Sequence, residues 1–190
     1  MGRWEPDAAG RLQQAALELY AERGFESTAV ADIAERAGLT ERTFFRYFAD
    51  KREVLFAGSG DLLDLIASGV ADAPGSMPPL DAVAVGLQSA ARFFEDRREY
   101  ARRRQDVIAA NTSLQERELI KLASLAAAVA GALRGRGASD LAATLTAEAG
   151  VAVFKIAFER WVGSEDGNLV ALMQDTLEEL QAVAGPTVSR

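Results

Sequence analysis

The sequence of 190 residues contains neither cysteine nor histidine. Without cysteine there is no disulfide and no thiolate metal ligand. Without histidine there is no zinc site of the usual ligands, no Ser-His or Cys-His nucleophile and no imidazole pH switch. Most enzyme designs are thereby excluded, and no carboxylate spacing indicates a catalytic pair. We therefore expect neither enzymatic activity nor a metal or other cofactor.

Proline and long apolar runs are also scarce. Three of the five prolines lie in the segment DAPGSMPP (72–79), and none occurs between residues 80 and 185. No unbroken apolar run approaches the roughly 18 residues that span a membrane. No basic segment followed by an apolar stretch marks a secretory signal at the start. These absences predict a cytoplasmic protein with no membrane partner.

Apolar residues recur at helical spacing, and no alternating β pattern occurs, so we predict an all-α fold of about nine helices. The first two short helices lie within residues 7–24 and 29–37, and a third covers about 41–48. A fourth opens with a capping box at Asp50 and Glu53 and continues to residue 70. Thr28 and Thr40 are the expected N-caps of the second and third helices. Five further helices are predicted at 80–96, 98–110, 113–134, 139–162 and 165–184.

The segment LTERTFFRYFADKREVL (39–55) has four aromatic rings in five positions. On a helix, Phe44 and Phe48 share one face and suit a core, whereas Phe45 and Tyr47 lie to either side of that face. Two short helices joined by a glycine-containing turn are typical of a helix-turn-helix. In that motif the second helix enters the DNA major groove.

This arrangement exposes the first turn of the third helix. Arg42 can then donate two hydrogen bonds to O6 and N7 of a guanine, and Thr43 can contact a thymine methyl or a phosphate. Phe45 can pack on a sugar, the Tyr47 hydroxyl can bind a phosphate, and residues at helix N-termini can bind further phosphates. The predicted DNA contacts are Thr28, Thr40, Arg42, Thr43, Phe45, Tyr47 and Lys51.

The net charge of −7 does not favour a nucleic-acid partner. Within residues 40–52, however, four basic residues stand against two acidic ones, and a local patch suffices for phosphate contact. A three-helix scaffold with no DNA affinity remains the alternative.

The pattern A-x-E-L-Y-x-E-R-G-F-x-S-T, followed by I-A-E-R-A-G-L-T-x-R-T-F-F-R-Y-F-x-x-K-x-x-V-L, covers residues 16–55. It closely resembles the DNA-binding domain of the TetR family of bacterial transcription regulators. In that family the seven positions named above usually contact DNA, although position 45 is more often Tyr and position 47 more often His. The resemblance implies a helix-turn-helix domain at 7–56 and a ligand-binding and dimerisation domain at 57–190.

The last two predicted helices are apolar on more than one face and need a partner. By resemblance to the family, they form a homodimer that reads a palindromic operator, while a buried monomeric core is the alternative. The implied function is a repressor that a small-molecule effector releases from DNA. An activator and a ligand-independent repressor remain open, as does a helical small-molecule or protein-binding module whose helix-turn-helix no longer binds DNA.

The effector itself is unidentified, and pocket candidates come from periodicity alone, so they suit a core equally well. They are Leu62, Ile66, Phe94, Val107, Ile108, Leu122, Phe154 and Phe158. Six arginines between Arg92 and Arg104 form either an anion site or a solvated face. The stretch RRRQDVIAANTSLQEREL is similar to family members thought to bind acyl-CoA-like ligands.

Overall fold

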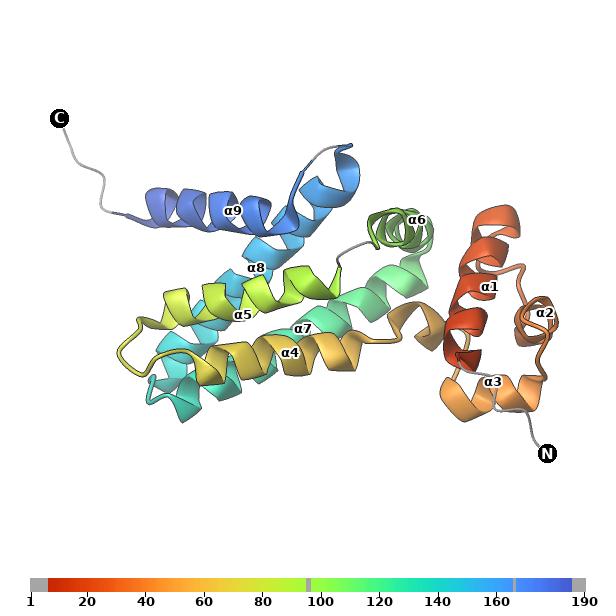
Figure 1. Ribbon diagram of the computed structural model, residues 1–190, viewed down its shortest axis with the longest axis horizontal. Coiled ribbons are helices and arrows are strands. Elements are labelled where there is room, and N and C mark those ends of the chain that lie inside the picture. The colour runs from red at the N-terminus through yellow and green to blue at the C-terminus, as the bar shows by residue number, and fades with distance from the viewer. Residues whose placement is uncertain (1–6, 95–96, 166, 186–190) are drawn as a thin grey trace. The chain divides into compact units, whose positions relative to one another are not determined.

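The structure is a computed structural model that describes residues 7–94, 97–165 and 167–185. Within these ranges all regular secondary structure is helical, which confirms the predicted fold class (Figure 1). The elements are α1 (Ala8–Arg23), α2 (Val30–Arg36), α3 (Glu41–Tyr47), the 3₁₀ helix η1 (Glu53–Phe56), α4 (Ser59–Asp72), α5 (Pro79–Phe93), α6 (Arg98–Ala109), α7 (Thr112–Gly135), α8 (Asp140–Gly163) and α9 (Leu169–Ala184).

The chain packs as two units. The N-terminal unit comprises the described residues up to Ser59 together with Tyr100–Leu119, and the C-terminal unit comprises Gly60–Glu99 and the residues from Ile120 onward. Most of α6 and the start of α7 therefore belong with the first three helices. The division expected from sequence, at residue 56, did not include them.

The core of the N-terminal unit is built from one apolar stripe on each short helix. Leu12 and Leu19 of α1, Ile33 of α2 and Phe44 of α3 are fully buried. Burying each such side chain contributes about 1.5–3 kcal/mol, which short helices need because they are marginal alone. The same cluster includes three residues from α6 and α7, namely Val107, Ile108 and Leu114.

The predicted N-cap of α2 is wrong, because Ala29 and not Thr28 occupies that position. The Thr28 side chain is buried, and its hydroxyl donates to the Gly24 carbonyl oxygen at 2.9 Å. Carbonyls at the end of a helix lack internal partners, so the α1 terminus takes up this hydroxyl. At the start of α2, Asp32 Oδ2 instead accepts from the Ala29 amide at 3.0 Å.

The predicted fourth helix is two pieces. The expected cap at Asp50 is wrong, because Arg52 is the N-cap of the first piece and makes no side-chain cap hydrogen bond, although Asp50 Oδ1 accepts from the Glu53 amide at 3.2 Å. The Glu53 carboxylate does not complete the capping box, because it pairs with Arg117 Nε of α7. η1 ends at Phe56, Gly58 takes a left-handed φ of +81°, and α4 begins only at Ser59.

Two further helix ends differ from the prediction. α9 begins at Leu169, where Asn168 Oδ1 accepts from the Val170 amide at 2.8 Å, and not at residue 165. α5 ends at Phe93, and the predicted continuation over 95–96 lies outside the described residues, as does residue 166.

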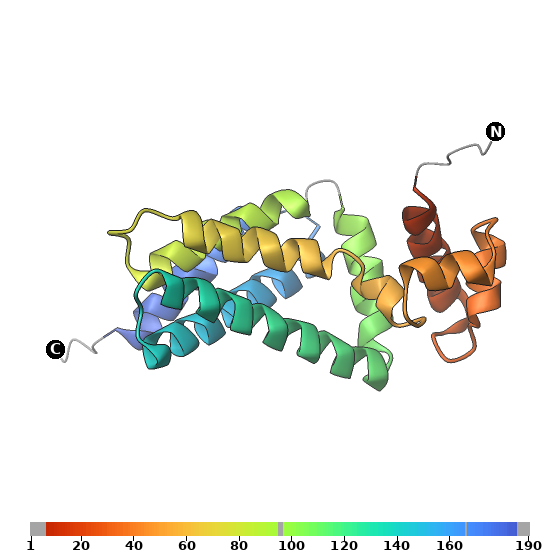
Figure 2. The same ribbon diagram turned by 90° about the horizontal axis from the view of Figure 1, so that it is seen from below.

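The C-terminal unit is a layered helical bundle. α4 and α5 run antiparallel and lie side by side (Figures 1 and 2). A Cβ on Gly86 of α5 would stand 2.6 Å from the Ile66 carbonyl oxygen of α4, so only glycine allows this close approach. α8 packs on α5 and α9, and α5 also packs on α9.

Two helical segments, Glu53–Asp72 and Asp140–Gly163, are long and apolar enough to cross a membrane by length and composition. The sequence prediction considered only unbroken apolar runs and missed them. The first segment is interrupted between η1 and α4, and the second, α8, packs against α5 and α9. Core helices of soluble proteins pass the same test, so these segments give only weak support for a membrane partner.

Candidate DNA-binding surface

The four aromatic rings around α3 divide between core and surface as predicted. Phe44 is fully buried, Phe48 is 8% exposed, and their ring centres are 5.4 Å apart. Phe45 and Tyr47 are 55% and 45% exposed. Two large exposed rings on one short helix are unusual for a solvated face and favour a contact surface.

Thr40 caps the N-terminus of α3 as predicted. Its hydroxyl oxygen accepts from the Thr43 amide at 3.2 Å and lies 3.1 Å from the Thr43 hydroxyl oxygen. The amides of Glu41 and Arg42 belong to the first turn, which has no internal acceptors. The partial positive charge of this helix end therefore suits a phosphate.

Arg42 extends from this turn into solvent. Among the residues that the structure describes, its guanidinium has no hydrogen-bond or ion-pair partner. The other basic side chains described in the N-terminal unit all have partners. Positions 38, 39, 45 and 46, which are three and four residues away along the chain, carry no carboxylate. No carboxylate is therefore placed to pair with Arg42 at the three- and four-residue helix spacing, although Glu41 precedes it in the chain.

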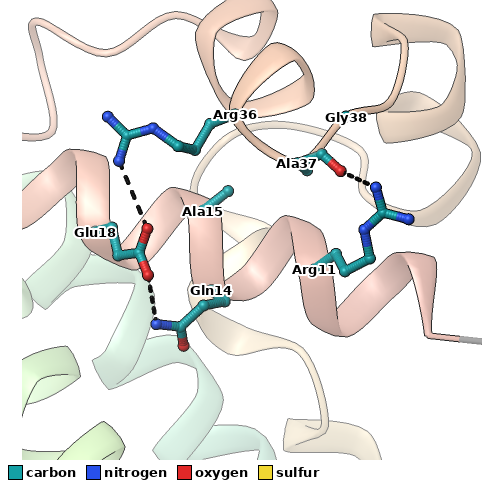
Figure 3. Close-up of a pocket in the computed structure, with 7 residues that line it drawn as sticks. All are labelled: Arg11, Gln14, Ala15, Glu18, Arg36, Ala37 and Gly38. Carbon is teal, nitrogen blue, oxygen red and sulfur yellow. Dashed lines mark hydrogen bonds and ion pairs between the residues drawn. The ribbon is translucent and has the colours of Figure 1, made fainter.

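Gly38 sets the turn between α2 and α3. It takes a φ of +67°, and the next amide, of Leu39, donates to the Ala34 carbonyl oxygen at 2.8 Å. Arg11 of α1 donates to the Ala37 carbonyl oxygen beside it (Figure 3). The left-handed backbone favours glycine here, whereas an added Cβ, 2.8 Å from Arg11 Nη2, would only displace the end of that flexible side chain.

An open depression lies between α1 and the end of α2 (Figure 3). Arg36 Nη1 lies 3.5 Å from Glu18 Oε2, and Arg11 binds the Ala37 carbonyl oxygen. No predicted site residue lines it. We assign it no ligand.

Two of the seven predicted contact residues turn their polar groups inward. Lys51 Nζ donates to the carbonyl oxygens of Phe25 at 2.9 Å and Thr28 at 3.1 Å, and it lies 4.3 Å from the centre of the Phe25 ring. The Thr28 hydroxyl is bound to Gly24, as described above. The reason for expecting phosphate contacts from this pair, an exposed polar group at a helix N-terminus, does not apply to these side chains.

The segment that follows α3 is held by groups that keep their ordinary charge at neutral pH. The Tyr20 hydroxyl donates to the Lys51 carbonyl oxygen at 2.6 Å. Burial raises the pKa of Tyr20, and the nearby Asp50 carboxylate raises it further. Hydrogen bonding from the Arg52 guanidinium, at 2.8 Å, lowers the pKa of Asp50.

Arg46, which the sequence places in the basic patch of residues 40–52 but which was not among the predicted DNA contacts, also belongs to this surface. Its Nη2 donates to the Tyr47 hydroxyl at 3.2 Å, and its guanidinium carbon lies 4.9 Å from the centre of the Tyr47 ring. The signal that could have found it is its spacing, since Arg46 is four residues after Arg42 and shares its helix face.

Comparison with known proteins identifies the family to which this helix-turn-helix belongs. Residues 12–57 match the family model described as bacterial regulatory proteins, tetR family, and residues 77–185 match the MftR C-terminal domain. The chain belongs to the TetR family. It is therefore a transcription regulator with an N-terminal helix-turn-helix, as the resemblance of residues 16–55 predicts.

Its relatives extend over most of the chain. A Mycobacterium tuberculosis protein, provisionally named the mycofactocin biosynthesis transcriptional regulator MftR, is 29% identical over 175 residues, covering 89% of this chain and 87% of that protein. The fatty acid degradation regulator FadR of Bacillus halodurans has a TM-score of 0.63 at 19% identity, covering 99% of this chain and 100% of that chain. FadR of Bacillus subtilis, solved with stearoyl-CoA, has a TM-score of 0.59 at 20% identity, covering 93% and 98%. Both structures share the fold.

The arginines between Arg92 and Arg104 of this TetR-family chain do not form one group. Arg98 Nη2 donates to the Trp161 carbonyl oxygen at 2.7 Å, near the end of α8. Arg104 Nε donates to the Leu55 carbonyl oxygen at 2.7 Å, and its Nη1 pairs with Glu118 at 3.2 Å. For these two, both sequence interpretations, anion site and solvated face, are wrong, because backbone carbonyls at helix ends take up the guanidinium groups. Glu95 and Asp96, which a solvated face would pair with these arginines, lie outside the described residues.

The eight predicted pocket residues of this regulator divide between the two units. Val107 and Ile108 are buried in the N-terminal core. The other six lie in the C-terminal unit. There Phe94 meets the rings of Phe154, Phe158 and Trp161, with centres 6.2, 5.1 and 6.1 Å away. Phe94 and Phe158 are half-buried, so this aromatic cluster keeps some accessible surface.

Proposed function

We propose that this TetR-family regulator is a homodimeric repressor that occupies a palindromic operator and leaves it when a small molecule binds the C-terminal unit. The observation that carries the DNA-binding part is the exposed, unpaired guanidinium of Arg42 among the described residues, on the first turn of a helix with outward aromatic rings. Such a group suits bidentate hydrogen bonding to guanine. Thr40, Thr43 and Phe45 would position the helix on the backbone.

The dimer would form through α8 and α9. Leu141, Leu145 and Ile156 lie on one face of α8 and are 71%, 61% and 47% exposed, and Val183 of α9 is 77% exposed. Large apolar side chains in a continuous stripe favour burial against a partner. The sequence analysis expected the last two helices, α8 and α9, to form this interface. A two-fold axis between two copies would present two α3 helices to two half-sites, which accounts for a palindrome.

The effector would be an acyl-CoA-like molecule. The supporting observations are the aromatic cluster around Phe94 and the shared fold with a FadR that was solved with stearoyl-CoA. The proposed pocket residues are those of the predicted set that lie in the C-terminal unit, namely Leu62, Ile66, Phe94, Leu122, Phe154 and Phe158. The effector would act by binding one conformation of the dimer better than the other.

We propose a cytoplasmic location, where the chromosome is accessible, and we propose no catalytic step. The experiment that tests the function is selection of random duplex DNA on the purified protein, with Arg42→Ala in parallel. We expect wild type to enrich a palindrome that the variant does not enrich. Bound operator should then be released by stearoyl-CoA, but not by coenzyme A alone. Absence of salt-sensitive duplex binding at low ionic strength would favour the alternative, a helical binding module without DNA affinity.

A further inference from the structure

Arg42 and Arg46 are the two outermost residues of α3. Phe44 and Phe48 mark the inward direction, because both are buried. With about 100° per residue, helix geometry places positions 42 and 46 nearly opposite that direction and about 6 Å apart along the axis. Both side chains are exposed. The line of the helix that points furthest from its own core therefore carries two guanidinium groups.

Arg46 is already held in place on this line. Its guanidinium lies over the Tyr47 ring at 4.9 Å and donates one hydrogen bond, from Nη2 to the Tyr47 hydroxyl at 3.2 Å. Arginine has five N–H donors in a planar fork, so most remain available for another acceptor. No other hydrogen-bond or ion-pair partner occurs for Arg46 in the described part of the chain. A guanidinium ordered in this way loses less conformational freedom on binding.

We propose that Arg46, oriented by Tyr47, reads a second guanine in the major groove alongside Arg42. The inference rests on the proposed operator binding. Guanine offers O6 and N7 to a bidentate guanidinium, and a separation of about 6 Å corresponds to about two base steps of 3.4 Å. Each half-site should therefore contain two guanines about two base pairs apart.

The position of Arg46 favours a base over a phosphate. Phosphate backbones flank a helix that lies in the groove, and Phe45 and Tyr47 occupy those flanks of α3. Position 46 of the helix lies between them on the outer line, and the Arg46 guanidinium leans from there toward Tyr47. Tyr47 is then a positioning residue for Arg46, which differs from the direct phosphate contact expected from sequence.

The test compares base preferences at every operator position for wild type, Arg46→Ala, Arg46→Lys and Arg42→Ala. Duplexes selected on wild type are varied one base pair at a time. We expect Arg46→Ala to lose about 5- to 150-fold affinity for the preferred site and to accept all four bases at one position. Arg46→Lys keeps the charge but not the planar fork, so it should relax the base preference at the same position.

Arg134→Ala is the matched charge control. It removes an exposed arginine that pairs with Asp140 in the C-terminal unit, and it should change neither affinity nor base preference.

Tyr47→Phe tests the positioning role, because it removes the hydroxyl and keeps the ring. We expect a weaker relaxation at the position that Arg46→Ala affects, and no additional effect of Tyr47→Phe in the Arg46→Ala background. If the two effects add, the Tyr47 hydroxyl acts independently and the positioning role is wrong.

The outcomes separate the inference from the function on which it rests. Uniform weakening by Arg46→Ala across all sequences, with a smaller salt dependence, would mean a phosphate contact and would overturn base reading. An unchanged preference would overturn it as well. Both outcomes leave the proposed function intact provided that wild type selects an operator. If wild type selects no sequence, the proposed function and this inference are both wrong.

Discussion

The ammonium nitrogen of Lys51 lies 4.3 Å from the centre of the Phe25 ring and 2.9 Å from the Phe25 carbonyl oxygen. The same nitrogen lies 3.1 Å from the Thr28 carbonyl oxygen. Lys51 follows α3 in the chain, and its side chain therefore holds the loop between α1 and α2 in place. Its contribution to DNA binding should act through this loop.

Lys51→Ala is expected to lower the free energy of unfolding by about 1–3 kcal/mol, because charged hydrogen bonds and a cation–π contact are lost. The shift in urea midpoint measures this loss. Lys155→Ala, at an exposed site on α8, should change the free energy of unfolding by less than about 0.5 kcal/mol. A variant of normal stability that binds all duplexes more weakly would show that Lys51 contacts phosphate instead.

Gly38→Ala is expected to destabilise the protein by about 1–2 kcal/mol, since residue 38 has a φ of +67°, which an L side chain rarely adopts. Operator affinity should fall with it, because the turn sets the angle of α3. Gly131→Ala is the matched control: that glycine lies inside α7 with nothing within 4 Å of an added Cβ. It should be neutral or stabilising by up to about 1 kcal/mol. Equal effects of the two substitutions in thermal unfolding would contradict the assigned role of Gly38.

A fragment of residues 1–59 is expected not to fold cooperatively. It lacks Val107, Ile108 and Leu114, which belong to the same apolar cluster as Leu12 and Phe44. It also lacks Arg104, whose guanidinium binds the Leu55 carbonyl oxygen and lies 4.9 Å from the centre of the Phe56 ring. Circular dichroism during urea titration should show a broad transition for the fragment and a sharp one for the full chain. A sharp transition of the fragment would mean that residues 100–119 are dispensable for this unit.

Asp50→Asn is expected to flatten the acid limb of the stability curve. The pKa of Asp50 is lowered in the folded state, mainly by the Arg52 hydrogen bond. A lowered pKa contributes stability above the unfolded-state value of about 4, and this stability is lost as the pH falls through the folded-state value. Urea midpoints between pH 7 and pH 3 should therefore fall less steeply in the variant, from a lower starting value. Parallel curves would show that other carboxylates dominate.

The recognition helix, α3, could be predicted because the sequence features that specify it are local. Thr40, Gly38 and the 44/48 spacing depend on caps, turns and periodicity over fewer than ten residues, and the structure has all three as expected. Arg42 was predictable as an exposed residue for the same reason.

The failures concern partners that are distant in sequence. Lys51 binds the Phe25 carbonyl oxygen, 26 residues away, and Arg104 binds a carbonyl 49 residues away. Val107 and Ile108 have the spacing of any amphipathic helix, and that spacing does not tell a ligand pocket from the core of another unit. Every residue has a backbone carbonyl, so no sequence pattern could have shown which carbonyls accept hydrogen bonds from these side chains.

The apolar face of α8 allows the proposed dimer to be tested without disturbing the monomer. Leu145 is 61% exposed, so glutamate there should not unfold the chain. In a dimer the same side chain would be buried, and a carboxylate there would lose its water without a partner. Leu145→Glu is therefore expected to sediment as a monomer at concentrations where wild type is a dimer. Its operator affinity should fall by about 100-fold or more, because two linked recognition helices bind far more tightly than one.

Ile120→Glu is the control. Ile120 is 54% exposed on α7, so this variant should leave the dimer intact. A dimeric Leu145→Glu would place the interface on another surface, and wild type that stays monomeric while it binds a palindrome would remove the two-fold argument altogether.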